Sequence, residues 1–198
     1  MKLFKLSVLF LSFFGVLKAQ TNDIKHIREK YSAIQKQIVA QKNNDIPENN
    51  THIIIKQNMP AIGEQQIDYN FYFELEDYNG SDDKIPEHHN LLFATRKYNV
   101  AASSETYEEF LYDESGNLIF YFQKVREEKC SQLRCYFKDN KLIKVIYKEA
   151  AVIDDKCPSA SKYKVILQSK NKLPEDFGME YLRSVSKKIK TIFTALDK

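Results

Sequence analysis

The sequence predicts an α+β fold, in which an antiparallel meander sheet of about seven or eight strands is covered on one face by an N-terminal and a C-terminal helix. Two observations predict the sheet. Residues 67–76 alternate between apolar and polar side chains, and segments 110–122 and 135–147 each read as strand, turn and strand. The helices are predicted by apolar residues that recur every three or four positions near both ends of the chain.

Residues 1–19 have the pattern of a secretory signal peptide. Two lysines precede an apolar run that ends at Leu17, and Ala19 is a small residue at the expected cleavage point. The apolar run is shorter than the roughly 20 residues that span a membrane. A retained membrane anchor is the alternative, because Leu17 occupies a position where a smaller residue is usual. We expect an exported protein, periplasmic or secreted, with a single mature domain over residues 20–198 and no membrane span after signal removal.

Removal of the signal peptide would change the charge balance. The chain carries 30 basic and 27 acidic residues, and three of the basic residues lie in residues 1–19, which contain no acid. The mature chain therefore has 27 of each, and the formal charge of +3 becomes zero. Nucleic-acid binding draws on an excess of Lys and Arg facing phosphate, so this balance argues against a nucleic-acid partner.

The first element predicted for the mature chain is an amphipathic helix. Asn22 and Asp23 precede it as candidate caps. A short helix of this kind is stabilised mainly by burying its apolar stripe, so we expect it to pack on the sheet; a free, partner-binding helix is the alternative. The stripe consists of Ile24, Ile27, Tyr31, Ile34 and Ile38.

Three strands follow, over residues 51–57, 67–76 and 90–102. The first connection, "NMPAIGE" at 58–64, contains a proline and a glycine that oppose regular structure. The second connection is the polar loop 77–89. The alternation within 67–76 indicates a strand with one buried and one solvated face, as in an antiparallel sheet.

Segments 110–122 and 135–147 resemble one another at an offset that places Gly116 opposite Asn140. Gly and Asn are the residues best able to take positive φ, which short hairpin loops require. We therefore interpret the likeness as two hairpins of one meander rather than as a repeated ligand site.

A last strand is predicted over residues 162–168, followed by a helix that Pro174, Glu175 and Asp176 open. The apolar stripe of this helix is Tyr181, Val185, Ile189, Ile192 and Leu196. Its basic face could contact anionic lipid or an acidic partner, although a solvated face that complements the helix dipole is the simpler interpretation. That face carries Arg183, Lys187 and Lys190.

Three cysteines in an exported chain suggest one disulfide and one remaining thiol. Cys130 and Cys135 would close a hairpin end, whereas a bond from either to Cys157 would close a longer loop, worth roughly 3.5 against 2 kcal/mol on the chain-entropy model. Cys135 alternates in phase with Leu133 and Phe137, as a buried core thiol would. This phase favours Cys130 with Cys157.

The sequence contains no familiar catalytic or phosphate-binding motif, and we expect no cofactor. The loop around 81–90 offers oxygen and imidazole groups to a metal in a spacing that matches no zinc pattern. These weak metal candidates are Asp82, Asp83, Glu87, His88 and His89.

The acid pairs Glu108–Glu109 and Asp113–Glu114 do not by themselves form a glycosidase site, because neighbours on a strand point to opposite faces. We interpret them as solvated strand and turn residues. An envelope hydrolase with His88, Glu108 or Asp113 as proton carriers is the alternative to a binding protein.

We expect a non-enzymatic binding protein that holds a protein or glycan partner on a sheet face and its loops. Twelve tyrosines without a tryptophan suggest recognition by exposed rings, with Tyr72 on a polar strand face and Tyr121 and Tyr136 on one common face; packing under the helices is the alternative. The binding candidates are Met59, Ile62, Tyr72, His88 and His89. A structural component of an envelope assembly is a further possibility.

The segments "REKYSAIQKQI", "QNMPAIG" and "EEFLYDESGNLIFYF" occur in an order that resembles a family of small exported bacterial proteins without an assigned activity. The likeness extends over most of the mature chain. It implies export and a fold of helices and sheet, and it implies no site residue.

Overall fold

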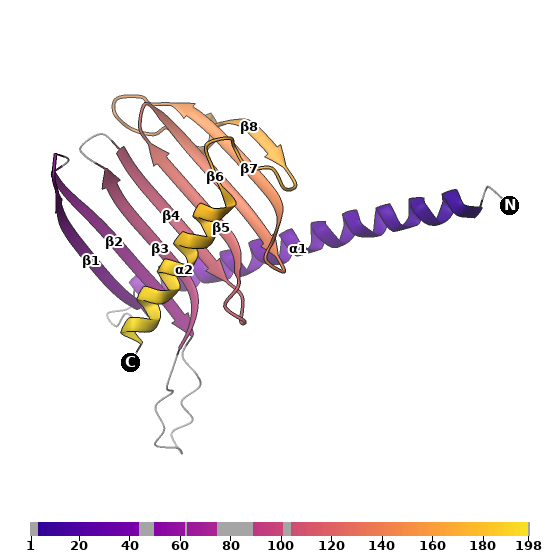
Figure 1. The fold of residues 1–198 in the computed structure, drawn as a ribbon, viewed down its shortest axis with the longest axis horizontal. Helices are drawn as coiled ribbons and strands as arrows, with labels where there is room; N and C mark the ends of the chain where they lie inside the picture. Colours follow the sequence, from indigo (N-terminus) through magenta and orange to yellow (C-terminus); the bar gives the residue numbers. More distant parts are fainter. Residues whose placement is uncertain (1–3, 44–49, 62, 75–88, 101–103, 198) are drawn as a thin grey trace, which may run out of the picture.

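The computed structural model describes residues 4–43, 50–61, 63–74, 89–100 and 104–197, with side chains from residue 21 onward except those of Glu74 and Val100. Within these residues, eight strands form one antiparallel sheet in which each strand pairs with the next in sequence (Figure 1). The strands are β1 (Asn50–Met59), β2 (Gly63–Glu74), β3 (Asn90–Val100), β4 (Ser104–Tyr112), β5 (Leu118–Arg126), β6 (Lys129–Lys138), β7 (Lys141–Ala151) and β8 (Lys164–Ser169). A short 3₁₀ turn, Ala160–Lys162, precedes β8. The predicted meander is confirmed.

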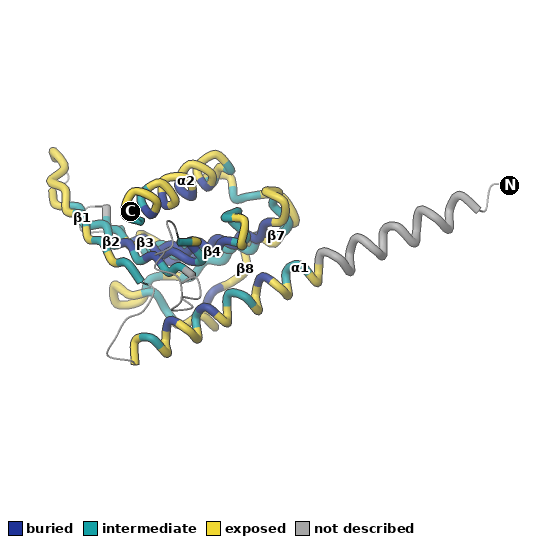
Figure 2. Tube along the Cα trace, turned by 90° about the horizontal axis from the view of Figure 1, so that it is seen from below, coloured by how far each residue is buried: buried dark blue, intermediate teal, exposed yellow. Residues whose placement is uncertain are grey.

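The N-terminal helix α1 (Phe4–Lys42) and the C-terminal helix α2 (Met179–Leu196) are also present, but they lie on opposite faces of the sheet (Figure 2). The expectation that both cover one face was wrong. The central strands are apolar on both sides, since Phe110, Leu111 and Tyr112 are consecutive on β4 and all fully buried. Consecutive strand residues point to opposite faces, so each face needs its own cover.

Each helix covers a separate apolar cluster. Under α2, Phe71, Phe110 and Tyr121 pack with residues that include Leu182 and Ile189. Under α1 the cluster comprises Ile27, Ile34, Ile38, Phe93, Leu111, Phe120 and Tyr136. The molecule is therefore a three-layer arrangement of helix, sheet and helix, in which neither sheet face is left bare along its centre.

Helix α1 buries the predicted stripe but begins earlier than expected. Asn22 and Asp23 lie inside the helix and do not cap it. The Asp23 carboxylate instead accepts a hydrogen bond from Lys138 Nζ at 2.8 Å, which ties the helix to the end of β6. The stripe is used as predicted, since Ile27, Ile34 and Ile38 are all buried.

Helix α2 begins at Met179 after Gly178, later than the predicted start at Pro174. Residues 174–177 form a turn closed by the bond from Phe177 N–H to Pro174 C=O. The buried stripe is displaced from the predicted one, since Leu196 is exposed and Tyr181 is only partly buried. Its members are Leu182, Val185, Ser186, Ile189 and Phe193.

The two hairpin turns have the predicted chemistry. Gly116 (φ 72°) and Asn140 (φ 58°) both take the left-handed conformation. The Asp113 carboxylate accepts hydrogen bonds from the backbone N–H groups of Ser115 and Asn117, at 3.0 and 2.7 Å. Asp113 is thus a structural turn residue.

The disulfide joins Cys130 to Cys157, as the phase of Cys135 suggested. Cys135 is a buried thiol, and burial raises its pKa to about 12. Among the described residues, no helix has the length and apolar character that crossing a membrane requires.

Candidate functional site

The predicted binding residues that the structure describes do not form one site. Met59 ends β1 and is partly exposed. Tyr72 is half-buried and its ring packs against that of Phe93, with 5.9 Å between centroids. His89 precedes β3 and pairs through Nδ1 with the Asp197 carboxylate, just beyond α2. The remaining binding and metal candidates lie outside the described residues: Ile62, Asp82, Asp83, Glu87 and His88.

His89 has a structural contact. Its backbone N–H donates to Asp197 Oδ2 at 2.6 Å while its ring pairs with the other oxygen, and the ring also packs against Phe73. These contacts tie the start of β3 to the end of α2. No group of three or more metal-ligating side chains occurs in the described part of the chain.

The tyrosines suggested for recognition are largely covered. Tyr121 is fully buried under α2, and Tyr136 is buried under α1. They do not share a face as expected, because Tyr136 pairs with Phe120 across β5 and β6, and Tyr121 points the other way. Packing beneath the helices, the alternative interpretation, describes both residues.

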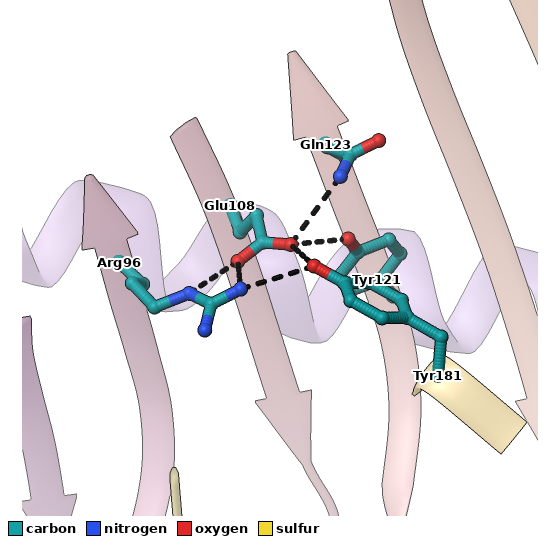
Figure 3. Close-up of polar contacts among 5 residues, drawn as sticks. All are labelled: Arg96, Glu108, Tyr121, Gln123 and Tyr181. Atoms are coloured by element: carbon teal, nitrogen blue, oxygen red, sulfur yellow. Dashed lines mark hydrogen bonds and ion pairs between the residues drawn. The ribbon is translucent and has the colours of Figure 1, made fainter. Parts of the chain in front are cut away.

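The most concentrated polar chemistry is a buried ion pair between the sheet and α2 (Figure 3). Arg96 on β3 lies directly opposite Glu108 on β4, and its Nε and Nη2 reach Glu108 Oε2 at 2.6 and 2.5 Å. The second oxygen, Oε1, accepts hydrogen bonds from Tyr121 Oη at 2.6 Å, Tyr181 Oη at 3.1 Å and Gln123 Nε2 at 3.3 Å. Arg96 also donates to Tyr181 Oη at 3.1 Å.

This network holds α2 in place. Tyr181 is the only one of the five residues in Figure 3 that comes from the helix, and it contacts both members of the ion pair. Burial and the Glu108 charge raise the pKa of Tyr181, so the phenol remains a donor. Each carboxylate oxygen of Glu108 accepts at least one hydrogen bond, and the side chain is fully buried. Glu108 is therefore a buried anchor for α2 rather than an exposed proton carrier.

Glu109 faces the opposite side of the sheet and is buried under α1. Its carboxylate accepts hydrogen bonds from Tyr31 Oη at 2.8 Å and Tyr107 Oη at 3.0 Å. Burial raises the pKa of Glu109, and the two tyrosine hydrogen bonds partly oppose that rise. The interpretation of Glu108 and Glu109 as solvated was wrong, but the expectation that they point to opposite faces is confirmed.

Sequence reasoning missed Arg96 as the partner of Glu108. Arg96 is in phase with Ala94, which is fully buried on the face under α2. That phase was a usable signal for a buried cation. The identity of its partner required the register of β3 and β4, which pairs Arg96 with Glu108.

A groove of about 850 Å³ runs beside α2. One wall is a full side of the helix, and the other is formed by the β4–β5 and β6–β7 hairpin turns. The apolar lining residues are Leu118, Phe137, Met179, Leu182 and Ala195, and the basic ones are Arg183, Lys187 and Lys190. The described lining contains no Asp or Glu. We call this surface the α2 groove.

Contacts within the α2 groove fix its shape. Lys190 Nζ donates to the Gly116 carbonyl at 2.9 Å and so bridges the helix to the β4–β5 turn. A Cβ at Gly116 would approach Lys190 Nζ to 3.3 Å, so a side chain there would crowd this bridge. Ser186 Oγ donates to Tyr112 Oη at 3.3 Å at the base of the helix.

In comparisons with known proteins, no family model, curated protein or solved structure matches the chain. The fold and the α2 groove are therefore the basis for the functional argument.

Proposed function

We propose that this protein is an exported, non-enzymatic binding protein, and that the α2 groove holds an acidic, partly apolar segment of a partner protein. The observation that carries the proposal is the lining of the groove, which combines an apolar floor with three cations and no described carboxylate. Such a surface attracts negative charge while removing apolar area from water.

The dimensions favour an extended segment over a compact ligand. The lining runs along α2 from Met179 to Ala195, a span of about 24 Å at 1.5 Å per helical residue. An extended peptide of roughly seven residues covers the same distance. The groove volume also lies within the range of about 300–1,000 Å³ that is usual for ligand sites.

Export is supported by the composition of residues 1–19 and by the Cys130–Cys157 disulfide, since disulfides persist in oxidising compartments. The hydrolase alternative receives less support. Of its proposed proton carriers in the described residues, Glu108 is held in an ion pair with Arg96, and Asp113 accepts a hydrogen bond from the Ser115 N–H in a turn.

Fluorescence anisotropy with defined peptides tests the proposal. The probes are a labelled peptide of alternating glutamate and leucine, and two controls in which lysine replaces glutamate or serine replaces leucine. We expect only the first peptide to bind. Lys187→Glu should weaken its binding at least about tenfold, equivalent to 1.4 kcal/mol. Lys188→Glu is the matched control, because Lys188 is exposed on α2 but does not line the groove.

Two results would contradict the proposal. Equal effects of the two substitutions would show that only the general charge of the helix matters. Binding to vesicles of anionic phospholipid, without binding to the peptide, would identify a lipid surface as the occupant instead.

A further inference from the structure

A second hollow, of about 680 Å³, lies on the other face of the sheet, at the end of β3, β4 and β5. None of its described lining residues comes from α1 or α2. The base of the hollow is a row of side chains from three neighbouring strands. The strand register places Lys97, Tyr107 and Lys124 side by side in this row. Tyr107 places this row on the α1 face, because its hydroxyl donates to Glu109.

The Cys130–Cys157 disulfide builds the wall of this hollow. Cys130 lies opposite Arg126 in the sheet, and the bond to Cys157 brings the segment after β7 against the ends of β5 and β6. Ile153 and Lys156 exchange two backbone hydrogen bonds, of 3.0 and 2.9 Å, which close a tight turn. Asp155, within that turn, has φ 56°. The turn and the disulfide together hold Lys156 beside the strand lysines.

The hollow carries an excess of positive charge. Four basic side chains line it, Lys97, Lys124, Arg126 and Lys156, against two carboxylates, Glu105 and Asp155, which leaves a formal charge of +2.

Glu105 orients part of this charge. It pairs with Lys97 Nζ at 2.7 Å and Arg126 Nη2 at 3.7 Å. These cations, with Lys97 the strongest, hold the pKa of Glu105 below its ordinary value, so Glu105 is ionised at neutral pH. Lys124 and Lys156 have no ion pair with a described residue. Glu105 thus holds Lys97 and Arg126 in ion pairs, whereas Lys124 acts on Glu105 only through its charge. Lys124 and Lys156 are therefore the cations available to contact a ligand.

We propose that this hollow is a binding site for a compact, multivalent anion of the phosphate-ester or sulfate-ester type, and that the disulfide keeps it assembled. An arginine presents paired donors to such an anion, and lysines add compact charge from several sides. The site is separate from the α2 groove and does not depend on the function proposed for it.

Isothermal titration of the oxidised protein with inorganic pyrophosphate tests this site. We expect saturable binding that Lys124→Gln and Lys156→Gln each weaken by about fivefold or more. Lys188→Gln is the matched control and should leave the affinity unchanged, since Lys188 is exposed on α2 and lines neither this hollow nor the α2 groove. No saturable binding of pyrophosphate or of a sulfated disaccharide would overturn the proposal. So would equal losses in all three variants.

The contribution of the disulfide is tested with Cys157→Ser. We expect this variant to keep its far-ultraviolet β-sheet spectrum while losing most of its affinity for pyrophosphate. Unchanged affinity would overturn the role of the disulfide. If Cys157→Ser does not fold, the affinity of Lys156→Gln for pyrophosphate is the test instead. This variant removes the cation that the turn positions and leaves the disulfide intact. Binding to phosphatidylglycerol vesicles without binding to either soluble anion would also overturn the proposal.

Discussion

Replacing Glu108 with glutamine should destabilise the protein strongly, because the substitution removes one charge of a buried pair and leaves the other. The Arg96 side chain is 11% exposed and that of Glu108 is 0% exposed. Breaking a buried pair on one side costs about 3–5 kcal/mol, since the remaining charge has lost both water and its partner. With a urea slope of about 2 kcal/mol per molar, the unfolding midpoint of Glu108→Gln should fall by about 2 M.

Urea unfolding followed by circular dichroism measures this loss. Glu105→Gln on the same strand is the control, because its contacts with Lys97 and Arg126 are solvent-exposed, and it should cost less than about 1 kcal/mol. The double variant Glu108→Gln with Arg96→Met should lose less free energy of unfolding than the two single variants lose together, since no isolated charge remains. Two results would refute the view that this pair anchors the fold. One is a loss of less than about 1 kcal/mol in the free energy of unfolding of Glu108→Gln, and the other is a double variant whose loss equals the sum of the two single losses.

Two further predictions concern buried titratable groups. Burial raises the pKa of Glu109 above its ordinary 4.5, so its contribution to stability is present below that value and is lost as the pH rises through the folded pKa. Glu109→Gln removes this dependence, so its urea midpoint should improve relative to that of the wild type as the pH is raised above about 4.5; parallel curves of midpoint against pH would contradict the assignment. Cys135 should resist a thiol reagent in the native protein and react once the chain is unfolded without reductant, because burial suppresses its thiolate. Rapid labelling of the native protein would contradict its burial.

The order of elements was predictable because it depends on local patterns. The alternation in residues 67–76 and the turn residues Gly116 and Asn140 each act within a few positions of the chain, and the structure contains the elements they predict. The disulfide was predictable for a similar reason. A period-two pattern places Cys135 in the core and leaves Cys130 to pair with Cys157.

The placement of the helices was harder to predict because it depends on both faces of the sheet at once. Phe110, Leu111 and Tyr112 form an uninterrupted apolar run, which is typical of a strand buried on two sides. That run was interpreted only as part of a hairpin, so the second covered face was missed. A strand with one solvated face predicts solvated polar residues on β4, whereas in the structure α2 covers Glu108 and α1 covers Glu109.

The α2 groove lay beyond the reach of the sequence for a related reason. Its basic residues were recognised on the helix, but its other wall comes from turns more than 40 positions earlier in the chain, at Gly116 and Asn140. These parts are brought together by long-range packing, which includes that of Leu182 and Ile189 against the sheet.

The placement of α1 has a consequence for how the chain folds during synthesis. The helix is made first, yet its contacts lie far ahead in sequence, since Tyr31 bonds to Glu109 and Arg28 bonds to Tyr136 across 78 and 108 positions. The meander can form hairpin by hairpin, because each strand pairs with its neighbour in sequence. The apolar side of α1 is therefore fully covered only after β6 has emerged, and a chaperone that shields it in that interval would protect the chain from aggregation.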